Sequence, residues 1–70
     1  METKDVGLFL TVEQKRIMFL LEDGMTTREI ASTMGYSERS VKYKLHAMNL
    51  RYNTKNRTQL IALLIRTGRL

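Results

Sequence analysis

Residues 26–46 hold two helix start signals on either side of a single glycine, and this spacing constrains the fold more than any other feature of the chain. The Thr26 hydroxyl can accept a hydrogen bond from the N–H of Glu29, and the N–H of Thr26 can donate one to the Glu29 side chain, which is the capping box that begins a helix. Gly35 suits the left-handed conformation at which helices commonly end. Ser37 can cap the helix that follows. Two capped helices joined by so short a turn are typical of a helix-turn-helix.

The rest of the chain carries matching signals for two more helices. Thr11 and Gln14 form another possible capping box, and Asn56 and Gln59 repeat the pattern. Because the chain has no proline and no sustained alternation of apolar and polar residues, we predict an all-α, four-helix domain. The predicted elements are a flexible N-terminal arm at 1–9 and, within a domain of residues 10–70, helices near 12–22, 27–34, 38–52 and 57–67.

Composition excludes several classes of protein. The chain has 70 residues and no cysteine, so it contains no disulfide, thiol nucleophile or cysteine-based zinc site. With one histidine and no paired acidic motif, we expect no enzymatic activity, no metal and no cofactor. No apolar run approaches the roughly 20 residues that span a bilayer, and the start of the chain is no signal peptide. We therefore expect a cytoplasmic protein without a membrane partner.

The charge of the chain is concentrated in its second half. Residues 1–35 hold four basic and six acidic residues, giving −2, whereas residues 36–70 hold eight basic residues and one acidic residue, giving +7. A basic half of this kind is the electrostatic pattern expected of a surface that binds phosphates. A solvated basic face without a partner would have the same charge, so the geometry of the helices must decide.

The third predicted helix has one apolar face and one basic face. Val41, Leu45, Met48 and Tyr52 recur at helical spacing and are predicted to face the core. At about 100° per residue, the opposite side is then defined. Its predicted contacts with DNA bases in the major groove are Arg39, Lys42, Tyr43 and His46. Hydroxyls, basic side chains and helix starts nearby are predicted to contact DNA phosphates through Thr26, Thr27, Arg28, Ser37, Ser40, Lys44 and Arg51.

Simpler interpretations stay open for single residues of this set. Ser37 is first of all a helix cap, and Tyr43 can be a surface aromatic residue without a ligand. A lone histidine among lysines, such as His46, is typical of a solvated surface. Leu50 is also predicted to face outward, where the first helix, a sugar or a partner would have to cover it. The presence of several such residues on one face is what favours DNA binding.

With the helices assigned, residues 10–70 resemble the LuxR-type (GerE-type) DNA-binding domain of bacterial transcription regulators. The matching segments are Leu10-Thr11, Thr27-Arg28-Glu29-Ile30-Ala31, Ser37 to Lys42, Asn56-Arg57-Thr58-Gln59 and Arg66 to Leu70. The resemblance implies a tetrahelical fold in which the third helix contacts bases through Lys42, Tyr43 and His46 and the fourth forms a dimer contact. The chain departs from the family pattern at Lys44, where the family has a histidine, and at Asn53, where it has the glycine of a turn.

The fourth predicted helix is apolar around more than half of its circumference. One core-facing stripe needs less than that, so part of this surface is expected to meet another surface. The same helix of a second copy would give a two-fold dimer, although a helix buried all round would show the same pattern. The predicted dimer interface consists of Leu60, Ile61, Leu63, Leu64, Arg66 and Thr67.

Two functions are compatible with these features. The first is a small stand-alone transcription regulator that binds specific sequences of double-stranded DNA as a homodimer. The second is a protein-interaction module that sequesters a larger regulator or modulates RNA polymerase through its apolar fourth helix. The basic outer face of the third helix favours the first function, because a purely sequestering protein does not need it.

Overall fold

The computed structural model describes residues 10–70, and the predicted arm at 1–9 lies outside the described residues. Within residues 10–70 the chain forms four helices and no strand, which confirms the all-α prediction. The helices are α2 (Val12–Glu22), α3 (Thr27–Met34), α4 (Glu38–Tyr52) and α5 (Arg57–Arg66). Their bounds agree with the predicted ones, except that α5 ends one residue earlier because Thr67 is its C-cap.

Each helix begins at its predicted cap. The Gln14 N–H donates to Thr11 Oγ1 at 3.0 Å while the Thr11 N–H donates to Gln14 Oε1 at 2.9 Å, and the same reciprocal pair begins α3. At α5 the Gln59 N–H donates to Asn56 Oδ1 at 2.9 Å. Gln59 Oε1, however, accepts from the N–H of Lys55 at 2.9 Å. The predicted capping box of α5 is therefore only half formed, and the second bond reaches one residue further back along the chain.

Residues with a left-handed backbone conformation end α3 and α4. Gly35 ends α3 at φ 76°, as predicted. Asn53 ends α4 at φ 57° and ψ 46°, a conformation that asparagine tolerates better than most side chains. Asn53 therefore takes the place of the family's glycine without losing the turn. The next residue reinforces it, since Thr54 Oγ1 donates to Asn49 Oδ1 at 2.6 Å.

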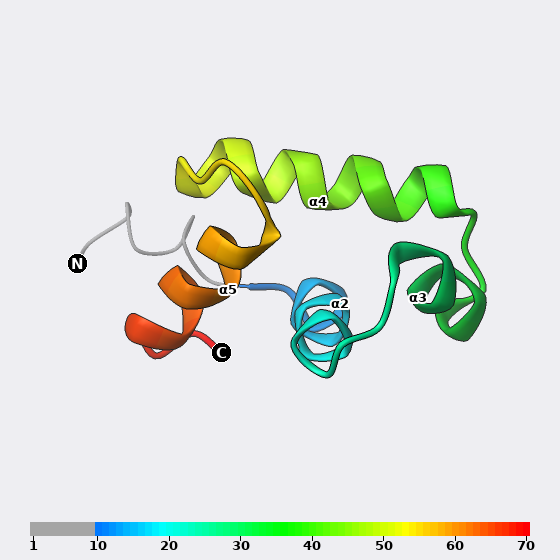
Figure 1. Cartoon of the computed structure of the whole chain (residues 1–70), viewed down its shortest axis with the longest axis horizontal. Coiled ribbons are helices and arrows are strands. Elements are labelled where there is room, and N and C mark those ends of the chain that lie inside the picture. Colours follow the sequence, from blue (N-terminus) through cyan, green and yellow to red (C-terminus); the bar gives the residue numbers. More distant parts are fainter. Residues whose placement is uncertain (1–9) are drawn as a thin grey trace.

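The longest helix, α4, lies along one side of the molecule, and the other three lie beneath it (Figure 1). In this view α3 lies below the N-terminal end of α4, α5 lies below its C-terminal end, and α2 lies between them. Both α3 and α5 pack on α4, and α2 packs on α3 and α5. One side of α4 is consequently fully occupied by the body of the domain, which leaves the opposite side toward solvent.

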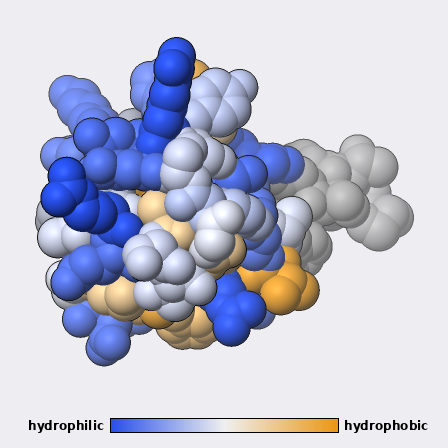
Figure 2. Space-filling model, turned by 90° about the vertical axis from the view of Figure 1, so that its right-hand side faces the viewer, coloured by the Kyte–Doolittle hydropathy of each residue, from blue (hydrophilic) through white to orange (hydrophobic). Residues whose placement is uncertain are grey.

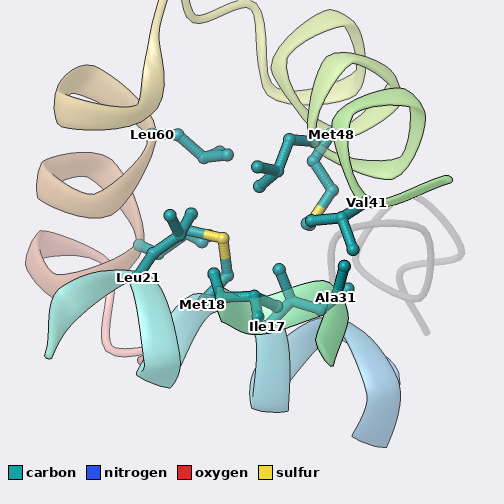
Figure 3. Close-up of a cluster of buried hydrophobic side chains, with 10 residues drawn as sticks. Ile17, Met18, Leu21, Ala31, Val41, Met48 and Leu60 are labelled. Atoms are coloured by element: carbon teal, nitrogen blue, oxygen red, sulfur yellow. The ribbon is translucent and has the colours of Figure 1, made fainter. Parts of the chain in front are cut away.

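A single core joins all four helices. Figure 3 shows Ile17, Met18 and Leu21 of α2 converging with Ala31 of α3, Val41 and Met48 of α4, and Leu60 of α5. The predicted core stripe of α4 is confirmed at its three buried members, and Tyr52 packs half-buried at the edge. Among residues 10–70, the buried apolar side chains are Ile17, Met18, Leu21, Ile30, Ala31, Val41, Leu45, Met48, Leu60 and Leu64.

The core also corrects part of the predicted dimer interface. Leu60 and Leu64 have no exposed surface. α5 packs on α2 and α4, and the domain encloses both side chains, so a second copy cannot touch them while the domain stays folded. Burying a leucine side chain fully stabilises a fold by about 1.5–3 kcal/mol. Leu60 and Leu64 both contribute this free energy to the core of their own chain.

Candidate nucleic-acid interface

The four residues predicted to contact bases share one exposed face of α4. Because Val41 and Leu45 point into the core, helical geometry turns the residues on the far side outward. Tyr43 is 72% exposed. Figure 2 views the molecule from its α3 end and shows hydrophilic side chains projecting from the α4 side, at the top. We call this surface the α4 face; its members are Arg39, Lys42, Tyr43 and His46, all exposed.

Glu38, at the start of α4, connects this face to α3. Its Oε2 accepts a hydrogen bond from Thr27 Oγ1 at 3.0 Å. The same carboxylate lies 3.6 Å from Lys42 Nζ and 3.9 Å from Arg28 Nε. Two cations that were predicted to contact DNA thus share one acidic partner. Sequence reasoning missed Glu38, although its i,i+4 spacing to Lys42 indicates an ion pair on a helix.

A second polar cluster anchors α4 to α2. Glu13 Oε1 lies 3.3 Å from Lys44 Nζ, the Tyr36 hydroxyl donates to Glu13 Oε2, and Lys44 Nζ lies 5.4 Å from the centre of the Tyr36 ring. The hydrogen bond from Tyr36, helped by Lys44, lowers the pKa of the Glu13 carboxyl. The same bond, with some burial, raises the pKa of the Tyr36 hydroxyl. We call these three residues the Glu13 cluster.

The predicted phosphate contacts occupy different positions. Thr27 is the clearest departure: it is 7% exposed and its hydroxyl donates to Glu38, so its side chain faces the protein and only its position at a helix start still fits the prediction. Lys44 is half-buried and turned toward Glu13. Ser40 is half-buried as well. The hydroxyls of Thr26 and Ser37 accept cap hydrogen bonds while staying at the surface. Of the predicted phosphate contacts, Arg28 and Arg51 are the cations that stay exposed.

Leu50 lies uncovered near the C-terminal end of α4. It is 70% exposed, so among the described residues α2 does not shield it. It borders a hollow together with Gln14, Ala47 and Arg51. Of the covers considered from the sequence, the first helix is therefore excluded for the described part of the chain.

The outer surface of α5 differs from the predicted interface. Ile61 and Leu63 are half-buried, and Arg66 and Thr67 are exposed. Ile65, which was not among the predicted interface residues, is 49% exposed and is the most exposed large apolar side chain of α5. Its apolar character was visible in the sequence, but which side of the helix the core would occupy was not.

Residues 10–70 hold neither a metal-binding cluster nor a membrane-spanning helix. No group of three or more histidine and acidic residues there could hold a metal ion. No helix in that part of the chain is long and apolar enough to cross a membrane.

Comparison with known proteins gives a family match. A family model described as "Bacterial regulatory proteins, luxR family" matches residues 8–64. A protein named "Probable transcriptional regulator ycf29" from Guillardia theta is 30% identical over 61 residues, covering 87% of this chain and 29% of that protein. Its namesake from Porphyra purpurea is 39% identical over 54 residues, covering 77% and 26%. The chain thus spans less than a third of the length of these relatives. No solved structure gives a significant match.

Proposed function

The chain belongs to the luxR family of bacterial regulatory proteins, and on that premise we propose that it binds double-stranded DNA with α4 in the major groove and regulates transcription. One observation carries the proposal. The face of α4 that turns away from the core presents two cations, an aromatic ring and a histidine, all exposed. A major groove accommodates one α-helix, and such side chains can bond to base edges there.

The residues around the α4 face are arranged to meet the DNA backbone. Arg28 lies in the first turn of α3, where free N–H groups and the helix dipole favour a phosphate. Arg51 lies in the last turn of the same helix that carries the α4 face. Contacts with phosphates position a protein on DNA, whereas contacts with base edges select the sequence. We assign selection to Lys42, Tyr43 and His46, and positioning to Arg28 and Arg51.

We also propose that the protein binds as a homodimer through the outer surface of α5. Ile65 is exposed there beside half-buried Ile61 and Leu63. An apolar surface on the last helix of a small domain favours contact with a second copy. Two α4 helices related by a two-fold axis would address half-sites about one turn of DNA apart. The competing function, capture of a larger regulator through α5, uses the same surface and would leave the α4 face without a role.

A salt titration of binding to DNA tests the proposal. An operator is first selected from a random pool, and affinity is then measured for this operator and for random duplexes. Lys42→Ala is expected to cost about 1–3 kcal/mol of binding at the base pair it contacts, because one base contact is lost. Arg51→Ala is expected to weaken binding to every sequence and to reduce the salt slope by about one. Absence of DNA affinity in the wild type at low salt would refute the function.

A further inference from the structure

Glu38 is an acidic residue on a surface that is proposed to bind negatively charged DNA. It is the only acidic residue among residues 36–70. It nevertheless lies in the first turn of α4, between Arg28 and Lys42. A carboxylate beside the phosphates of DNA opposes binding to any sequence. Its presence between two cations of the basic surface therefore requires a reason.

The surrounding structure holds the Glu38 carboxylate in place. Thr27, which is nearly buried, donates its hydroxyl proton to Oε2. The N-terminus of α4 also favours a negative charge at this position. The Glu38 side chain is 37% exposed, whereas those of Arg28 and Lys42 are 85% and 65% exposed. The carboxylate is thus the fixed member of the group, and the two cations are the members free to move to another partner.

We propose that Glu38 attenuates DNA binding by competing with DNA for the two cations that flank it, an inference that rests on the proposed DNA binding. Ion pairs between exposed side chains are weak, so Arg28 and Lys42 can leave Glu38 for DNA. After they leave, the carboxylate stays beside the DNA and repels phosphates whatever the sequence. Both the lost ion pairs and this repulsion oppose binding to an operator as well as to a random duplex. Glu38 therefore lowers the affinity for DNA in general.

The proposal predicts how neutral substitution changes binding. Glu38→Gln removes the charge and keeps an oxygen that can accept the hydrogen bond from Thr27. Arg28 and Lys42 are then free to contact phosphates on any duplex. Each additional phosphate neutralised makes the slope of log affinity against log salt steeper by about 0.9. Affinity should rise about threefold to tenfold for random DNA and by at least as much for the operator.

A matched control separates this effect from net charge. Glu22→Gln makes the same charge change at the exposed end of α2, where the described residues show no ion pair with Glu22. Its random and operator affinities should rise together, by less than about twofold, because exposed charges beyond a Debye length of roughly 10 Å are largely screened. Glu38→Asp keeps the negative charge, so its affinity for random DNA should stay as low as that of the wild type.

Binding of all four proteins to a random duplex and to the selected operator is measured by fluorescence anisotropy over a range of salt. A higher affinity for both duplexes and a steeper slope for the random duplex in Glu38→Gln alone would support the proposal. The same values in Glu38→Gln and Glu22→Gln, or weaker random binding by Glu38→Gln, would overturn it and leave Glu38 a purely structural contact. A wild type that binds neither duplex would instead refute the DNA-binding function itself.

Discussion

The two C-terminal helices, α4 and α5, differ in the chemistry of the side that faces away from the core. Both bury a narrow stripe in the common core, Val41, Leu45 and Met48 from α4 and Leu60 and Leu64 from α5. The outer side of α4 carries the cations of the α4 face, and its exposed apolar residue, Leu50, lies apart from them near the C-terminal end. The outer side of α5 keeps Ile65 exposed. The basic surface of α4 can therefore stay in contact with water, whereas covering the apolar surface around Ile65 of α5 would lower the free energy.

The attachments of the two helices to the body of the domain also differ. Besides its apolar stripe, α4 is tied down by polar side chains, through Lys44 in the Glu13 cluster and through Glu38 to α3. The side chains of α5 that reach the core are apolar. Polar anchors specify direction, because hydrogen bonds depend on angle as well as distance. Apolar burial is not directional. The orientation of α4 is therefore held more closely than burial alone would hold it.

The largest expected effect tests whether α5 is part of the core. Leu64→Ala should lower the free energy of unfolding by about 2–5 kcal/mol, because it removes a fully buried side chain and leaves a cavity. Leu50→Ala removes the same atoms from the exposed side of α4 and should change stability by no more than about 0.5 kcal/mol. Urea denaturation followed by circular dichroism measures both. Equal losses in the two variants would mean that Leu64 is not buried in the core.

The next effect concerns the outer surface of α5. Ile65→Glu should weaken self-association at least tenfold, about 1.4 kcal/mol, because a charge would have to be buried in the proposed two-fold contact. Val12→Glu makes the same kind of change at an exposed apolar residue of α2 and should leave association unchanged. Analytical ultracentrifugation across protein concentrations gives the constants. If Ile65→Glu remains as dimeric as the wild type, α5 is not the interface.

The smallest effect distinguishes the polar anchor of α4 from the apolar anchor of α5 by pH. The pKa of Glu13 is lowered from 4.5 in the folded protein, chiefly by the hydrogen bond from Tyr36. A lowered carboxyl pKa contributes stability above the unfolded value, and this contribution is lost as pH falls through the folded value. Tyr36→Phe should therefore be less stable than the wild type at pH 7, and the difference should shrink below pH 4.5.

Leu64→Ala serves as the control for this pH dependence, since its deficit arises from a cavity and should persist at low pH. Thermal unfolding of the three proteins between neutral and acidic pH gives the comparison. The high-pH side provides a second check. The raised pKa of Tyr36 contributes stability that is present below the ordinary tyrosine value and is lost as pH rises through the folded value. If the loss of stability in Tyr36→Phe were the same at every pH, the Glu13 cluster would not anchor α4.

Local signals predicted the helices and the α4 face because the interactions behind them span three or four residues. The caps at Thr11, Thr26 and Ser37 join near neighbours in the chain, so neither their partners nor their geometry depends on the rest of the fold. The outward direction of Tyr43 follows in the same way from the apolar residues on the opposite side of its own helix. Asn53 was identified as a departure from the family, but its left-handed conformation appears only in the structure.

The sequence alone therefore determined where the helices begin and end, that they are four within residues 10–70, and which face of α4 is basic. Packing decided the rest. The burial of Leu64, the exposure of Ile65, the turn of Lys44 toward Glu13 and the contact of Thr27 with Glu38 each join segments that are distant in the chain or depend on where the core lies. The physical reason is that a helical period fixes the angles between side chains around one axis, whereas only the neighbouring helices determine which of those angles is the inside.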